Sequence, residues 1–82
     1  MFTVHFVHIS DRVLYSGFAD RVIVPGVQGT IEVGETHCPI VSLLYKGKVM
    51  IRETEKEKEW KTFLIYQGLM RFDGEKLEAV VE

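Results

Sequence analysis

The sequence contains a single cysteine, two prolines and no surplus of basic residues. One cysteine cannot form a disulfide within the chain, which fits a reducing compartment. The net charge is −2, and no block of Lys and Arg is present that would follow phosphates, so nucleic acid is a poor partner. No apolar run approaches the ~18–20 residues that cross a bilayer, and the start of the chain lacks the features of a signal peptide. We therefore expect no direct membrane insertion.

The length of 82 residues predicts one domain that spans residues 1–82. A domain of this size buries roughly 60–65% of the surface that its unfolded chain exposes. That leaves room for one thin core, and a deep enclosed active site would compete with it.

Short runs rich in Val, Ile, Phe and Tyr recur between Gly, Pro and Asp, which is typical of an all-β sandwich or barrel. In an extended strand alternate side chains share a face. We therefore expect Phe2, Val4 and Phe6 to share one face of a strand, and Val22 and Val24 to share a face of another. Ile31, Val33, Val49 and Ile51 are expected to point inward. No segment favours a helix, because the best candidate, residues 55–66, has an aromatic and β-branched second half.

Turn signals separate these runs. Residues 10–12 read as a turn, the next two strands are expected to join near Gly17, and residues 25–29 ("PGVQG") predict a tight reversal. The charged segment 54–59 ("TEKEKE") is expected at the solvent-exposed tip of a long hairpin. Asp73-Gly74 is a dipeptide that favours the tight turn of a last hairpin.

Residues 39–45 ("PIVSLLY") are predicted to form a buried strand. Another segment is apolar on both faces. In residues 62–67 ("TFLIYQ"), Phe63 and Ile65 share one face, and Leu64 and Tyr66 share the other. Neighbouring loops could cover this second face, or it could dock another protein, since exposed apolar area tends to mark interfaces.

The stretch "GETHCP" raises the question of metal or nucleophile chemistry. His37, Cys38 and Glu35 are possible ligands, but structural zinc usually needs four thiolates or imidazoles, and the chain has one cysteine. His5 and His8 differ by an odd number, so on one strand they point to opposite faces. Adjacent Cys and His side chains diverge, which disfavours a nucleophile with its base. A cysteine before a proline is more often a small buried filler.

Phosphate cradles are also disfavoured. The segments "GVQG" and "YKGK" contain glycine and lysine, but neither has the GxxxxGK[ST] spacing and neither precedes a predicted helix. We expect no nucleotide site, no metal and no cofactor.

An ordered set of motifs over essentially all 82 residues resembles a known family. The segments are "HISDRVLYSGFADRVIVPGVQGTIEV", "THCP", "YKGKV" and "YQGLMRFDGEKLEAVV", and together they resemble the N-terminal β-sandwich domain of the F-type ATP synthase epsilon subunit. The resemblance implies a flattened antiparallel sandwich of about ten short strands. It also implies a non-catalytic subunit of the central stalk that links the gamma subunit to the polar loops of the membrane c-ring. That role would couple rotation to ATP synthesis by a proton-translocating enzyme, peripheral to the bacterial inner membrane on its cytoplasmic side.

The resemblance carries over to particular positions. His37 matches the histidine of the family's G-H-x-P turn, which lies near gamma. Ser10 and Ser42 match other positions that face gamma. The resemblance also implies a turn that faces the c-ring, formed by Gly26, Gln28, Gly29 and Thr30.

The sequence departs from the family pattern at several points. Thr36 stands where glycine usually precedes the histidine, Gln67 replaces the first glycine of a G-G pair, and Thr30 stands where many members carry glutamate. The family usually continues into a two-helix hairpin, whereas this sequence ends at Glu82, so helix-mediated inhibition and ATP sensing are expected to be absent. Two other hypotheses remain: a small β-barrel that binds a ligand, and a small Cys/His enzyme.

Overall fold

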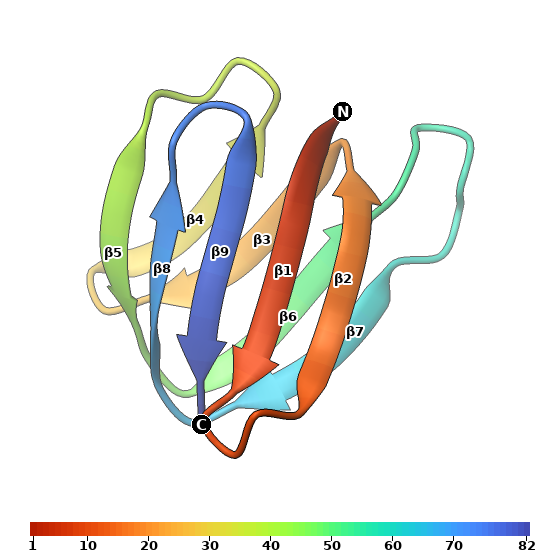
Figure 1. The fold of residues 1–82 in the computed structure, drawn as a ribbon. Coiled ribbons are helices and arrows are strands. Elements are labelled where there is room, and N and C mark those ends of the chain that lie inside the picture. The colour runs from red at the N-terminus through yellow and green to blue at the C-terminus, as the bar shows by residue number, and fades with distance from the viewer.

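The computed structural model describes all 82 residues and consists of nine strands with no helix (Figure 1). The family resemblance implied about ten strands, and the structure has nine. No helix is present that could span a membrane. The strands are β1 (Phe2–His8), β2 (Val13–Ala19), β3 (Arg21–Gly26), β4 (Gly29–Gly34), β5 (Ile40–Leu44), β6 (Gly47–Arg52), β7 (Lys61–Ile65), β8 (Gly68–Phe72) and β9 (Lys76–Val81).

The strands form two layers around one core (Figure 1). The first layer has the order β2-β1-β9-β8-β5, and the second has the order β4-β3-β6-β7. The layers join where Gly26 of β3 pairs with Leu44 of β5, the one residue pair between these strands. A Cβ atom on Gly26 would lie 2.7 Å from the carbonyl oxygen of Gly29. The corner that joins the layers therefore requires glycine.

One strand pair runs against the predicted antiparallel pattern. β1 and β9 are parallel, whereas every other pair is antiparallel. These two strands lie at opposite ends of the chain, so no hairpin dictates their relative direction. Side chains alternate with period two in both kinds of pair, so the sequence pattern carried no sign of the direction.

The core confirms the predicted alternation. Sixteen side chains are buried, and all of them are apolar. Ile31 and Phe63 are partly buried against this core. The buried residues are Phe2, Val4, Phe6, Ala19, Val22, Val24, Val33, Leu44, Val49, Ile51, Ile65, Met70, Phe72, Leu77, Ala79 and Val81.

Most of the predicted turns are confirmed, and one is wrong. Residues 54–59 lie at the tip between β6 and β7, and Asp73-Gly74 lies between β8 and β9. The strands were expected to join near Gly17, but β2 continues to Ala19 and Gly17 pairs with Val4 of β1. A Cβ on Gly17 would lie 3.5 Å from the Tyr15 hydroxyl oxygen, an ordinary van der Waals contact, so this position does not require glycine. Gly17 lies within a strand, and the chain turns at Asp20.

The prediction of a buried strand at residues 39–45 is wrong for one face. Leu44 is buried, whereas Val41 and Leu43 on the outer face of β5 are exposed. The reason is that no layer of this chain covers the outer side of β5.

Candidate functional site

His37 lies in the loop between β4 and β5 and is fixed by its own turn. Its backbone N–H donates to the carbonyl oxygen of Gly34 over 3.1 Å, and its ring Nδ1–H donates to the carbonyl oxygen of Cys38 over 2.6 Å. The ring also meets the Phe72 ring edge to face, with centroids 6.2 Å apart. The Nε2 atom makes no hydrogen bond within the chain, so it is the ring atom that a partner could bind.

Ser10 lies in the turn between β1 and β2. Its hydroxyl and its backbone N–H both donate to Nδ1 of His8, over 2.7 and 3.1 Å. Asp11 in the same turn has a φ of 70°, a conformation that short polar residues tolerate. These contacts fix an exposed turn at the opposite end of the first layer from the His37 loop (Figure 1).

Ser42 lies on the inward side of β5, opposite Met70 of β8. It is half-buried, and its hydroxyl donates to the carbonyl oxygen of Leu43 over 3.0 Å. Ser42 also lines an open hollow together with Gln28 and Thr30. The structure therefore brings Ser42 next to the turn predicted to face the c-ring, and it keeps Ser10 and His37 at two other places.

The tight reversal predicted at residues 25–29 is confirmed, and two backbone hydrogen bonds join it to the segment around β5. The β3–β4 hairpin turns through Val27 and Gln28, and Gly29 has a φ of +129° that favours glycine. The N–H of Val27 donates to the Leu43 carbonyl over 3.1 Å. The N–H of Tyr45 donates to the Pro25 carbonyl over 2.7 Å. These bonds hold the turn against β5, so it can meet a partner with little loss of conformational entropy.

A larger feature, the outer face of the first layer, was not predicted from the sequence. Leu43, Leu69 and Val80 pair in register across β5, β8 and β9, and the same row continues to Val7 of β1 and Val13 of β2. Leu43 is 60% exposed, Leu69 is 50% and Val80 is 53%. We call these five residues the outer row. Strand register, which the sequence does not reveal, is what joins single exposed residues into one apolar surface.

Leu64 and Tyr66 form a second exposed apolar feature, next to the open edge of β7. Leu64 is 79% exposed and Tyr66 is 70%. Cover by neighbouring loops was one open interpretation of this strand, and the structure excludes it for both side chains. The ammonium of Lys46 lies 5.6 Å from the centre of the Tyr66 ring.

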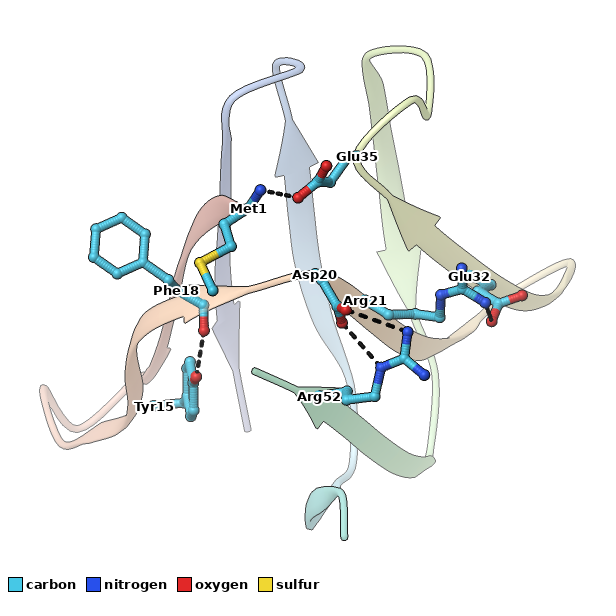
Figure 2. A network of polar contacts seen from close by, with 8 residues as sticks. All are labelled: Met1, Tyr15, Phe18, Asp20, Arg21, Glu32, Glu35 and Arg52. Atoms are coloured by element: carbon cyan, nitrogen blue, oxygen red, sulfur yellow. Dashed lines mark hydrogen bonds and ion pairs between the residues drawn. The ribbon is translucent and has the colours of Figure 1, made fainter. Parts of the chain in front are cut away.

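Figure 2 shows a network of polar contacts where β2, β3, β4 and β6 approach one another. Asp20 accepts two hydrogen bonds from the Arg52 guanidinium, over 3.0 Å to Nε and 3.3 Å to Nη2. The bond to Asp20 raises the pKa of Arg52. The guanidinium also lies 5.3 Å from the centre of the Trp60 ring. This cluster fixes the start of β3 against the end of β6.

The other charged groups in Figure 2 are also paired. The amino group of Met1 pairs with Glu35, and Arg21 pairs with Glu32 over 3.2 Å. The hydroxyl of Tyr15 donates to the Phe18 carbonyl over 2.8 Å, and burial raises the pKa of Tyr15. Every charge drawn in this network therefore has a partner within the chain, so the network is one that stabilises the fold.

The residues considered for metal or nucleophile chemistry are not assembled for it. Cys38 is exposed, so its interpretation as a buried filler is wrong. The loop that carries it is held by hydrogen bonds of His37 and needs no packing from the thiol. The His37 ring binds the carbonyl of Cys38 through Nδ1. No three His, Cys, Asp or Glu side chains lie close enough to hold a metal ion.

The fold and these surfaces define a small β-sandwich that exposes apolar side chains and turn residues. The family described as "ATP synthase, Delta/Epsilon chain, beta-sandwich domain" matches residues 1–82. The chain belongs to this family, which confirms the resemblance found in the sequence.

Several relatives support the assignment. The ATP synthase epsilon chain of Brevibacillus brevis is 39% identical over 72 residues, which cover 88% of this chain and 53% of the relative. The epsilon chain of Chlorobaculum tepidum is 30% identical and covered to 80%. This chain thus spans about half the length of the Brevibacillus relative. A chain in a solved structure described as the central stalk and c-ring of the Tetrahymena thermophila mitochondrial ATP synthase has a similar fold, with a TM-score of 0.76 and 17% sequence identity. The match covers 98% of the present chain and 62% of the Tetrahymena chain. That likeness shows a shared fold.

Proposed function

We propose that this chain is a non-catalytic subunit of the central stalk of a proton-translocating F-type ATP synthase. It links the gamma subunit to the c-ring and so couples rotation to ATP synthesis. The observation that carries the proposal is the match of the whole chain to the family. The likeness to a chain from a central stalk and c-ring assembly supports the location. In bacteria this location is the cytoplasmic side of the inner membrane, where the subunit is held through its partners.

The gamma subunit contacts Ser10, His37 and Ser42 in this proposal. These residues lie around the first layer: Ser10 in the turn after β1, His37 in the loop before β5, and Ser42 on β5 itself. Ser10 and His37 lie at opposite ends of this layer (Figure 1), and Ser42 points to the inward side of β5, away from the outer row. In this proposal gamma also covers the outer row, since exposed apolar area tends to mark interfaces.

The c-ring contacts the turn formed by Gly26, Gln28, Gly29 and Thr30. The hydrogen bonds from Val27 and Tyr45 support this proposal, because they fix the backbone of the turn before a partner arrives. Thr30 offers a hydroxyl where many family members offer a carboxylate, so we expect a neutral hydrogen bond at this position.

Binding to purified gamma tests the proposal. The chain is mixed with the gamma subunit of the same organism, and the mixture is separated by size-exclusion chromatography. We expect the two proteins to elute together in equal amounts. Separate elution of a folded chain and a folded gamma subunit, at micromolar concentrations and low salt, would contradict the proposal.

The alternative of a small-molecule binding barrel is disfavoured by the packing. The interior between the layers is filled by side chains such as Phe6, Met70 and Phe72, each essentially fully buried. Edge-to-face ring pairs join Phe2 to Phe72 and Phe6 to Phe63, with centroids 5.2 and 5.4 Å apart. A ligand inside the sandwich would have to displace these contacts.

A further inference from the structure

We infer that the free chain pairs with a second copy of itself through the outer face of the first layer. The pairing uses a two-fold axis that runs parallel to the strands, between β8 and β9. This inference goes beyond the role in the stalk, because it concerns the chain before it meets any other subunit. It rests on the outer row, on the charges beside it, and on their common symmetry about this axis.

The outer row is the apolar part of the surface. Four of its residues lie across four neighbouring strands in the order Leu43, Leu69, Val80 and Val7. The midpoint of these four lies between Leu69 and Val80. A two-fold rotation about an axis through this midpoint places Leu69 opposite the partner's Val80. It places Leu43 opposite the partner's Val7, so apolar residues meet apolar residues at these four positions, and Val13 lies outside the matched set.

The next row along the strands carries charge, and it obeys the same symmetry. Arg71 of β8 and Glu78 of β9 are paired in register, with Nη2 and Oε1 3.6 Å apart within one chain. The same axis places Arg71 opposite the partner's Glu78, and Glu78 opposite the partner's Arg71. Two ion pairs between copies therefore form without any rearrangement of the strands. Lys76, whose Nζ is 3.4 Å from Glu78, adds positive charge beside that carboxylate.

A third row, formed by Gln67 and Glu82, lies on the opposite side of the outer row from Arg71 and Glu78. Its two side chains are also complementary to those of a second copy under the same axis. Gln67 precedes β8, Glu82 follows β9, and the N–H of Glu82 donates to the Gln67 carbonyl over 2.9 Å. The Gln67 amide donates to the Glu82 carboxylate of its own chain, and the two-fold axis also brings it to the partner's Glu82 carboxylate. The central positions of three successive rows thus match under one symmetry operation, as an interface between identical subunits requires.

The size of the face limits the strength of the pair. Four strands at ~4.8 Å spacing and three rows at ~6.8 Å spacing cover about 400 Å² on each copy. Stable complexes bury about 800 Å² on each partner. The pair is therefore weak, and a gamma subunit that covers the same face with a larger contact would displace the second copy. Self-pairing would shield the apolar row from nonspecific association until then.

Charge reversals distinguish this arrangement from general stickiness. When two copies of R71E pair, carboxylates face each other at both charged positions, and when two copies of E78R pair, guanidinium groups face each other there. We expect each variant alone to raise the dissociation constant of self-pairing roughly 3- to 30-fold, because two symmetric ion pairs become repulsive. A mixture of R71E and E78R sets carboxylate against guanidinium at both places. The mixture is therefore expected to pair at least as tightly as the wild type.

The measurement is sedimentation equilibrium in low salt over a range of concentrations, with circular dichroism to verify the fold of each variant. Leu69→Ser provides a second variant without a charge change, and it should also weaken pairing. K48E and E57R carry matched charge changes away from this face, on β6 and on the charged tip, so their mixture should gain nothing. The inference is overturned if the wild type stays monomeric up to roughly 1 mM, or if mixed R71E and E78R pair no better than each alone.

Discussion

Arg52 and Asp20 form a two-point ion pair that joins positions 32 residues apart in the sequence. The backbone repeats the connection, because the N–H of Asp20 donates to the Arg52 carbonyl over 3.0 Å. Both side chains are largely buried. The pair thus connects the turn between β2 and β3 to the end of β6.

Replacement of Asp20 by Ala should lower the midpoint of thermal unfolding, because it leaves the Arg52 guanidinium partly buried with no carboxylate. Arg52→Lys should also lower it, since an ammonium cannot form the two-point contact. Thermal unfolding followed by circular dichroism measures both effects. Glu32→Ala, which removes an exposed ion pair, is the control and should change the midpoint much less. Equal midpoints for Asp20→Ala and Glu32→Ala would show that the buried pair has no special role.

The hydrogen bonds of Asp73 predict that part of the free energy of unfolding is lost in acid. Its carboxylate accepts hydrogen bonds from the N–H groups of Glu75 and Lys76, over 2.9 and 2.8 Å, and these bonds lower the pKa of Asp73 below its ordinary value of 3.8. A lowered pKa in the folded state means that the stabilisation is present at neutral pH. It is lost as the pH falls below about 4 and through the folded-state pKa.

The variant Asp73→Ala should therefore be less stable than the wild type at pH 7, and the difference should shrink as the pH falls below about 4. Urea unfolding at a series of pH values from neutral to about 3 measures this difference in free energy of unfolding. A difference that stays constant down to the lowest pH would mean that the carboxylate charge does not contribute.

Replacement of Ile51 by Asp should unfold the domain. Ile51 is fully buried on β6 and pairs with Val22 of β3, so a carboxylate there would be desolvated with no partner. The cost of several kcal/mol is comparable with the ~5 kcal/mol stability of a small domain. Ile51→Val should cost only about 0.5–1.5 kcal/mol, and Lys48→Asp on the exposed face of the same strand should remain folded. A soluble, folded Ile51→Asp would show that the inward side of β6 is assigned wrongly.

Replacement of Gly26 by Ala should disturb the corner where the layers join. The new Cβ would lie 2.7 Å from the Gly29 carbonyl oxygen, a backbone atom that cannot move independently of the turn. We expect a loss of about 1–3 kcal/mol in the free energy of unfolding, as for other overpacked sites. Gly34→Ala is the matched control, because a Cβ there meets no atom within 4 Å. Equal stability of the two variants would contradict the close approach at Gly26.

The residues that share a strand face were predicted well because burial repeats every second residue in a strand, as for Val22 and Val24 or Val49 and Ile51. The hairpin tips at residues 54–59 and at Asp73-Gly74 were predicted because turn chemistry is local. Gly17 misled for the opposite reason. It lies within β2, where it pairs with Val4 of β1, and a glycine inside a strand leaves the same sequence signal as a glycine in a turn.

The interaction surface could be predicted only in part. The residues expected to face partners were assigned through the family resemblance, and their spatial grouping could not be read from the sequence. Ser42 lies beside Gln28 and Thr30 because β5 packs against the β3–β4 turn. The outer row depends on the register of β5, β8, β9 and β1, including a parallel pair that joins the two ends of the chain. Such non-local pairings lie beyond a single-sequence pattern.

The affinity of the chain for purified gamma tests the proposed function most directly. Isothermal titration is performed with the wild type, His37→Ala and Ser42→Ala, and circular dichroism verifies that each variant is folded. We predict binding by the wild type, and a dissociation constant raised roughly fivefold or more, about 1 kcal/mol, in each variant. Failure of the folded wild-type chain to bind gamma would contradict the proposed place in the central stalk.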